Sequence, residues 1–149
     1  MAEYRVWAPE HEQMRVVVDG ETHPMYPSPG GWWHAEVDGA GHGSAYAFLV
    51  GDDETPLPDP RSLWQPGGVH AASRRYDHDH FMWTDSAWTG RQLPGSVLYE
   101  CHIGTFTTDG TFDAAIGRLD HLVDLGVDLV ELLPVNAVDG PWNWGYDGV

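Results

Sequence analysis

The chain has 149 residues, 42% of them hydrophobic, and its 7 basic and 23 acidic side chains give a net charge of −16. This length suits one medium domain or two small ones, each with a packed core. Because nucleic acids and anionic membrane surfaces are bound through clustered Lys and Arg, the charge argues against both as partners.

The beginning of the chain, MAEYRVWAPE, has no basic start followed by an apolar core and therefore predicts no signal peptide. No apolar run approaches the roughly 20 residues that a membrane span requires. The one cysteine, Cys101, excludes an internal disulfide and fits a reducing compartment. The expected location is the cytoplasm.

Residues 1 to about 90 predict short strands separated by turns. Alternating or β-branched segments occupy residues 4–9, 14–20, 31–37 and 44–50, with Gly, Pro and Asp between them. Their number and spacing indicate a small antiparallel β-sandwich. Residues 56–95 are irregular but contain Trp and Phe, which favours an ordered connecting segment packed between two domains.

From residue 96 the pattern changes to that of a βαβ unit. Residues 96–104 predict a strand and residues 127–135 a second strand, buried on both faces. Between them, residues 111–126 predict one helix, with Thr111 as N-cap, Asp113 in its first turn and Gly126 at its end. Consecutive strands joined through a helix are expected to be parallel with a right-handed crossover.

One βαβ unit cannot cover its own sheet, so residues 91–149 predict the beginning of a βα-repeat domain that continues in a longer protein. In such domains function lies at the carboxyl ends of the strands. The loop from residue 136 onward follows the second strand at that end. It holds Trp144, Tyr146 and Asp147, which resemble the lining of a binding cleft.

Other candidate residues have a structural interpretation that we favour. Glu100 and Glu131 lie mid-strand, below the expected site, and are interpreted as buried and hydrogen-bonded. The Asp77 to His80 segment predicts a solvated turn, since no further ligands stand at metal-site spacing. No glycine-rich phosphate loop is present, and the sequence predicts no cofactor.

The aromatic residues divide into two groups. Trp7, Trp32 and Trp33 fit the sandwich core or its surface, with a sugar platform as the alternative. Trp144 and Tyr146 are the better candidates for contact with a sugar because of the position of their loop.

The segments LPDPRSLWQPGGVH, YECHIGTFTTDGTFDAAIGRLDHL and WNWGYDGV closely resemble the malto-oligosyltrehalose trehalohydrolase family of the α-amylase superfamily, glycoside hydrolase family 13. VWAP and GWWHAEV resemble the immunoglobulin-like early-set domain of that family, which is related to carbohydrate-binding module family 48. Cys101 stands where a leucine is usual, a small packing change.

The resemblance implies a fold and a reaction. Residues 1–90 would form the immunoglobulin-like domain with its connecting segment, and residues 91–149 the start of a truncated catalytic (β/α)8 barrel. The family cleaves the α-1,4 bond next to the terminal trehalose unit of maltooligosyltrehalose and releases trehalose. Its three catalytic carboxylates follow later strands, so none is assigned in this chain, which alone is expected to be inactive.

The same resemblance assigns substrate contacts. Tyr146 matches the tyrosine that stacks on the sugar at the cleavage subsite, and Trp144 and Asp147 belong to the same motif. The expected partner is maltooligosyltrehalose or a related α-glucan oligosaccharide. Two alternatives remain: a non-catalytic α-glucan-binding fragment, and the N-terminal part of a branching or debranching enzyme.

Overall fold

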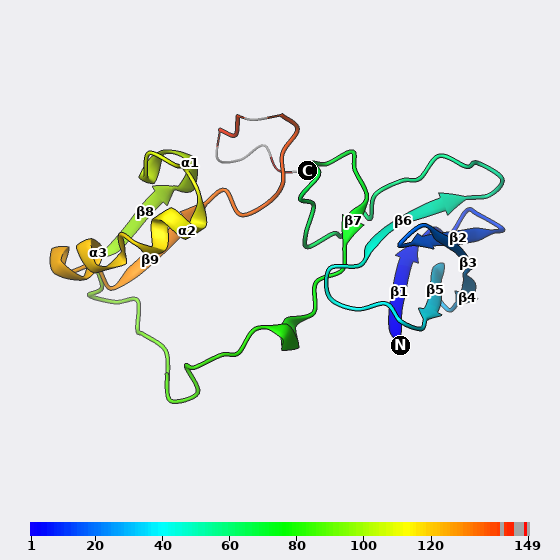
Figure 1. Cartoon of the computed structure of the whole chain (residues 1–149). Coiled ribbons are helices and arrows are strands. Elements are labelled where there is room, and N and C mark those ends of the chain that lie inside the picture. Colours follow the sequence, from blue (N-terminus) through cyan, green and yellow to red (C-terminus); the bar gives the residue numbers. More distant parts are fainter. Residues whose placement is uncertain (141, 145–147, 149) are drawn as a thin grey trace. The chain divides into compact units, whose positions relative to one another are not determined.

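The structure, a computed structural model, describes residues 1–140, 142–144 and 148. The chain forms two compact units, residues 1–82 and residues 83–149 (Figure 1). The assignment of residues 1–90 and 91–149 to functional domains stays a prediction. Within the described residues, no helix has both the length and the apolar composition that crossing a bilayer requires.

The first unit is a sandwich of two antiparallel sheets (Figure 1). One sheet has the order β1-β5-β4 and the other the order β3-β2-β6-β7. The strands are β1 (Ala2–Trp7), β2 (Met14–Val18), β3 (Glu21–Pro24), β4 (Tyr26–Ser28), β5 (Trp32–Val37), β6 (Ala45–Val50) and β7 (Ser73–Arg74). The predicted antiparallel sandwich is therefore confirmed.

Alternation along the strands builds the core of this unit. Along β1 every second residue is buried, because successive side chains of a strand point to opposite faces of its sheet. The buried residues of the two inner faces form one cluster: Ala2, Tyr4, Val6, Met14, Val16, Val18, Met25, Trp33, Ala35, Val37, Tyr46 and Phe48. Burial of this apolar surface is the main contribution to the stability of the sandwich.

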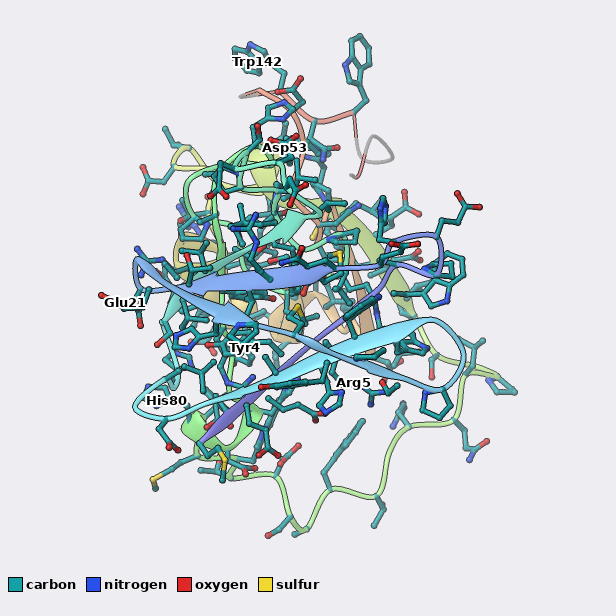
Figure 2. All side chains as sticks on the ribbon, turned by 90° about the vertical axis from the view of Figure 1, so that its right-hand side faces the viewer. Tyr4, Arg5, Glu21, Asp53, His80 and Trp142 are labelled. Carbon is teal, nitrogen blue, oxygen red and sulfur yellow. The ribbon has the colours of Figure 1, made fainter. Side chains whose placement is uncertain are left out.

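Asp19 and Gly20 make the two-residue turn between β2 and β3, as Val18 pairs with Glu21. Both have positive φ, 49° and 92°, which is the backbone of a type I′ hairpin. The segment expected at residues 14–20 is therefore strand β2 up to Val18, closed by the Asp-Gly turn that its sequence indicates, whereas β3 after the turn was not predicted. Figure 2 shows Glu21 at the outer end of this hairpin.

Alanine at Gly20 is expected to destabilise the first unit by about 1 kcal/mol, because a side chain is strained at this positive φ although no atom blocks it. Gly41→Ala is the matched control, since Gly41 also has open space around its Cβ position but no positive φ. Urea unfolding followed by far-UV circular dichroism measures the difference. Equal stability of the two variants would contradict the turn assignment.

The segment after β6 is largely irregular, as predicted, but it is tied to the second sheet. Leu57 forms an isolated antiparallel bridge with Phe48, and β7 pairs with β6. The buried Ser73 hydroxyl accepts a hydrogen bond from the backbone N–H of Asp59 at 3.0 Å. Further along, His78–His80 form a short 3₁₀ helix, η1, capped by the Asp77 side chain.

The second unit contains two parallel, paired strands, and the helices of the unit lie between these strands in the sequence (Figure 1). Its elements are β8 (Leu98–His102), α1 (Ile103–Phe106), α2 (Phe112–Ile116), α3 (Leu119–Leu125) and β9 (Leu129–Leu133). Strands β8 and β9 pair in register from Leu98 with Leu129 to His102 with Leu133. The predicted strand, helix, strand order and the parallel pairing are confirmed.

The prediction of one continuous helix over residues 111–126 was wrong. Thr111 does cap the beginning, accepting from the backbone N–H of Ala114 at 3.2 Å, and Gly126 ends it with φ of 83°. The helix is interrupted at Gly117 and Arg118, where Arg118 has φ −114° and ψ 1°. Glycine is a poor helix former, and the chain tightens there to a three-residue hydrogen bond from Arg118 to Ala115.

The expectation that β9 is buried on both faces was also wrong for this chain. Val130 and Leu132 are more than one-third exposed, and only Ala115 and Leu122 of the α2 and α3 residues are buried. The residues of β9 are apolar as expected, but the described residues of this unit do not form the second layer that would cover the strand.

Candidate functional site

His102 connects the end of β8 to the loop that follows β9. Its Nε2 lies 2.9 Å from the carbonyl oxygen of Asn143. Because a carbonyl only accepts, Nε2 carries the proton and donates it, and Nδ1 is buried without a partner among the described residues. The contact joins the carboxyl end of the first strand of the pair to the segment just before Trp144.

Two glycines allow the backbone to pass close to this histidine. A Cβ at Gly104 would lie 2.9 Å from Cε1 of His102, so a larger residue would push against the imidazole. A Cβ at Gly110, whose φ is +62°, would lie 2.9 Å from the carbonyl oxygen of Gly104. The turn after β8 therefore brings the backbone of Gly104 close to the His102 ring, and the backbone of Gly110 close to that of Gly104.

A hollow of about 790 Å³ adjoins His102. Its lining includes Glu100, Arg118 and His121 together with the hydroxyls of Thr105, Thr107 and Thr108. The ring of Tyr99 meets that of Phe106 edge-on at 6.2 Å. The hollow thus combines aromatic faces with donors and acceptors, the combination that binds hydroxylated ligands.

Glu100 and Glu131 are paired in register on the two parallel strands. Their interpretation as buried residues is wrong for this chain, because both are exposed. Each lies two residues before the last residue of its strand, and therefore below the carboxyl end of the pair, where His102 lies. Nothing in their surroundings marks either carboxylate as a catalytic acid.

The predicted binding loop is described in part. Trp144 is 83% exposed, and its neighbour Trp142 is exposed to a similar degree. Tyr146 and Asp147 lie outside the described residues. His102 was not among the predicted site residues; a polar side chain near the carboxyl end of a predicted strand was the signal that could have identified it.

The tryptophans of the sandwich separate into core and surface. Trp33 is buried, which confirms its interpretation as sandwich core and excludes the alternative of a sugar platform at this residue. Trp7 is exposed, and it is the cross-strand partner of the half-buried Trp32 on the outer face of the first sheet. This face offers flat aromatic surface to solvent, but the arginines stacked on Trp32 occupy part of it.

The remaining candidates show no catalytic arrangement. Burial raises the pKa of the Cys101 thiol, which keeps it protonated and a poor nucleophile. His80 stacks on His42 with ring centroids 3.9 Å apart, as part of an aromatic cluster with Trp64 and Tyr76. Over the part of the chain that the structure describes, no three His, Cys, Asp or Glu residues gather to hold a metal ion.

Comparison with known protein families identifies the first unit. Residues 2–63 match the carbohydrate-binding module 48 family, described as the isoamylase N-terminal domain. This span contains β1 to β6, the strands that form most of the sandwich. The immunoglobulin-like early-set assignment of the first unit is therefore confirmed.

Comparison with curated proteins covers the whole chain. It is 54% identical to a malto-oligosyltrehalose trehalohydrolase of Mycobacterium tuberculosis over 152 residues, which include all of this chain and 26% of that protein. A 1,4-alpha-glucan branching enzyme of Vibrio parahaemolyticus is 31% identical, over 98% of this chain and 22% of that protein. The chain thus spans about a quarter of the length of these relatives, and the resemblance predicted from its motifs is confirmed.

Among solved structures, a Salmonella typhimurium protein assigned as an alpha amylase matches with a TM-score of 0.91 and 36% identity. The match covers 99% of this chain and 25% of that protein. Sequence and structure comparisons therefore point to the same group of α-glucan-acting proteins.

Proposed function

We propose that the chain is the N-terminal part of a glycosidase of the malto-oligosyltrehalose trehalohydrolase kind, because its whole length corresponds to the N-terminal quarter of such enzymes. The enzyme would hydrolyse the α-1,4-glucosidic bond next to the terminal trehalose of maltooligosyltrehalose and release trehalose. The observation that carries the proposal is the 54% identity, which extends beyond the sandwich into the β8 to β9 region.

We assign the second unit to the start of a (β/α)8 barrel. The parallel β8 and β9, joined through α2 and α3, have the connection that such a barrel repeats. The exposed apolar residues of β9 and of the helices support this assignment, since further strands and helices of a barrel would cover them. The first unit would be the accessory domain that precedes the barrel, and the cytoplasmic location remains a prediction from the sequence.

The substrate contacts are proposed for the loop after β9. It follows a strand at its carboxyl end, where barrel enzymes bind their substrates. Tyr146 would stack on the sugar, with Trp144 and Asp147 beside it. The hydrogen bond from His102 to the Asn143 carbonyl supports this role, because it fixes the beginning of the segment that carries these residues.

The two alternatives have weaker support. A branching enzyme matches over nearly the same residues, but at 31% rather than 54% identity. A purely glucan-binding function would be supported only by the match of residues 2–63 to a carbohydrate-binding module family. The match to trehalohydrolases continues beyond these residues through the second unit, which such a function does not explain.

Joining residues 1–149 to the remaining three-quarters of the Mycobacterium tuberculosis relative provides the test. We expect this chimera to release trehalose from maltooligosyltrehalose, because β8 and β9 would then pack against the remaining strands of the barrel. The 149-residue chain alone is expected to release none. Trehalose is measured by chromatography after incubation with purified substrate.

Two controls make the result decisive. The corresponding N-terminal region of the Vibrio parahaemolyticus branching enzyme, joined to the same remainder, is expected to give an inactive protein. A folded but inactive chimera of the present chain, beside an active parent enzyme, would overturn the proposal. Retention of the inactive 149-residue chain on amylose would then favour the glucan-binding alternative.

A further inference from the structure

A small pocket in the first unit concentrates positive charge in a strongly acidic chain. It lies beside β1 and β7, each of which is an edge strand of its sheet, and has a volume of about 190 Å³. Four arginines line it: Arg5, Arg61, Arg74 and Arg75. They are four of the seven basic residues of a chain whose net charge is −16.

These arginines are held by carbonyl oxygens and aromatic rings. Arg74 donates to the carbonyl of Gly43 at 2.7 Å, and Arg75 donates to the carbonyl of Glu3 at 2.8 Å. The guanidinium carbons of Arg5 and Arg61 each lie 5.3 Å from the ring centroid of Trp32. Such contacts orient a guanidinium without neutralising its charge.

Two carboxylates also line the pocket, those of Glu3 and Asp59, so the four arginines leave it a net charge of +2 (four minus two). Asp59 keeps its charge and is held by hydrogen bonds from the Tyr46 hydroxyl at 2.7 Å and from the backbone N–H of Arg61 at 2.8 Å. Glu3 lies 3.8 Å from Nε of Arg5, and both side chains are more than half exposed, which makes the ion pair weak. In the described part of the chain, this is the one ion pair found for the four arginines.

A buried hydroxyl at the pocket lacks a hydrogen-bond partner. Tyr4 is only 3% exposed, and its hydroxyl oxygen has no partner among the described residues. β1 carries Tyr4 on its buried face and Arg5 on its exposed face (Figure 2), and Arg75 lies over the Tyr4 ring at 5.5 Å. Burial raises the pKa of Tyr4, so the hydroxyl keeps its proton and remains a donor.

We propose that this pocket binds a small oxyanion, either inorganic phosphate or the phosphate group of a monoester. Guanidinium groups present paired N–H donors that match phosphate oxygens, and the Tyr4 hydroxyl adds a neutral donor that otherwise costs free energy when buried and unpaired. The volume is below the roughly 300–1,000 Å³ typical of pockets for larger ligands, which fits a phosphate group rather than an oligosaccharide. This site is independent of the proposed hydrolase function.

Titration calorimetry of the 149-residue chain with inorganic phosphate tests the site, with chloride at equal ionic strength as reference. We expect saturable binding of phosphate and no heat from chloride. Arg61→Gln and Tyr4→Phe are each expected to weaken binding about tenfold, since each removes one hydrogen bond to a charged group. Tyr4→Phe removes only a hydroxyl without a partner, so it should preserve the fold.

Arg15→Gln is the matched control, because Arg15 belongs to the same unit but pairs with Glu54 at 2.8 Å outside the pocket. Its phosphate affinity is expected to be unchanged. A hexose monophosphate titrated in parallel distinguishes the two sources: tighter binding than phosphate assigns the site to an ester, and equal or weaker binding to the free ion. Absence of saturable binding for both, or equal weakening by Arg15→Gln and Arg61→Gln, would overturn the proposal.

Discussion

Replacing Trp33 by alanine is expected to lower the free energy of unfolding of the sandwich by about 3–5 kcal/mol, the range for deleting a buried aromatic side chain. Trp33 is 7% exposed and packs within the single core cluster of the first unit. Its Nε1 also donates to the carbonyl of Ala8 at 3.1 Å. Because small domains are stable by roughly 5–15 kcal/mol, a loss of this size removes a substantial share of the total stability.

Trp7→Ala separates the contribution of burial from that of the hydrogen bond. Trp7 donates its Nε1–H to the carbonyl of Gly30 at 3.0 Å, but 59% of its surface is exposed. We expect its loss to cost about 1 kcal/mol, the net value of one hydrogen bond. Hydrogen exchange of the β2 and β6 amides reports the stability of this unit alone, and similar losses for the two variants would contradict the assignment of Trp33 to the core.

The sandwich was largely predictable because its strands alternate. In β1, β2 and β5 the apolar residues fall at every second position, and the buried side chains follow that period. The strands that were missed, β3, β4 and β7, have four residues or fewer, too few for a periodic pattern. Their pairing is set by their neighbours in the sheet instead.

The second unit shows where sequence patterns are insufficient. Leu119, Leu122 and Val123 have helical spacing in the sequence, yet the pattern does not register that Gly117 interrupts the helix before them. The apolar run of β9 predicts burial, but burial depends on whether other elements cover the strand. The apolar residues of β9 indicate that the strand needs a covering layer, but they do not show whether this chain supplies that layer.

Contacts between residues far apart in the sequence were the feature of the structure that was hardest to predict. His102 and Asn143 are 41 positions apart, and no local pattern indicates that the imidazole would donate to that carbonyl. The same holds for the arginines of the oxyanion pocket, which come from β1, from the irregular segment between β6 and β7, from β7 and from the residue directly after β7. In both cases the sheet edges and strand ends bring together residues that the sequence separates.

In the active chimera, His102→Ala is expected to lower kcat/KM for maltooligosyltrehalose about 100-fold, the effect of a displacement of roughly 1 Å in a catalytic site. The alanine removes the donor that holds the Asn143 carbonyl at 2.9 Å, and with it the position of the loop that carries Trp144 and Tyr146. Gln at position 102 can donate through its amide to the same carbonyl and should restore part of the activity.

His121→Ala is the control, since His121 lines the same hollow but lies on α3 rather than at the end of β8. A role in positioning predicts that His102→Ala raises KM and lowers kcat together, because the loop would bind both substrate and transition state less well. A role limited to stability predicts unchanged constants for the folded fraction. Equal constants for His102→Ala and His121→Ala, measured at matched folded concentration, would therefore reject His102 as the residue that positions the substrate-binding loop.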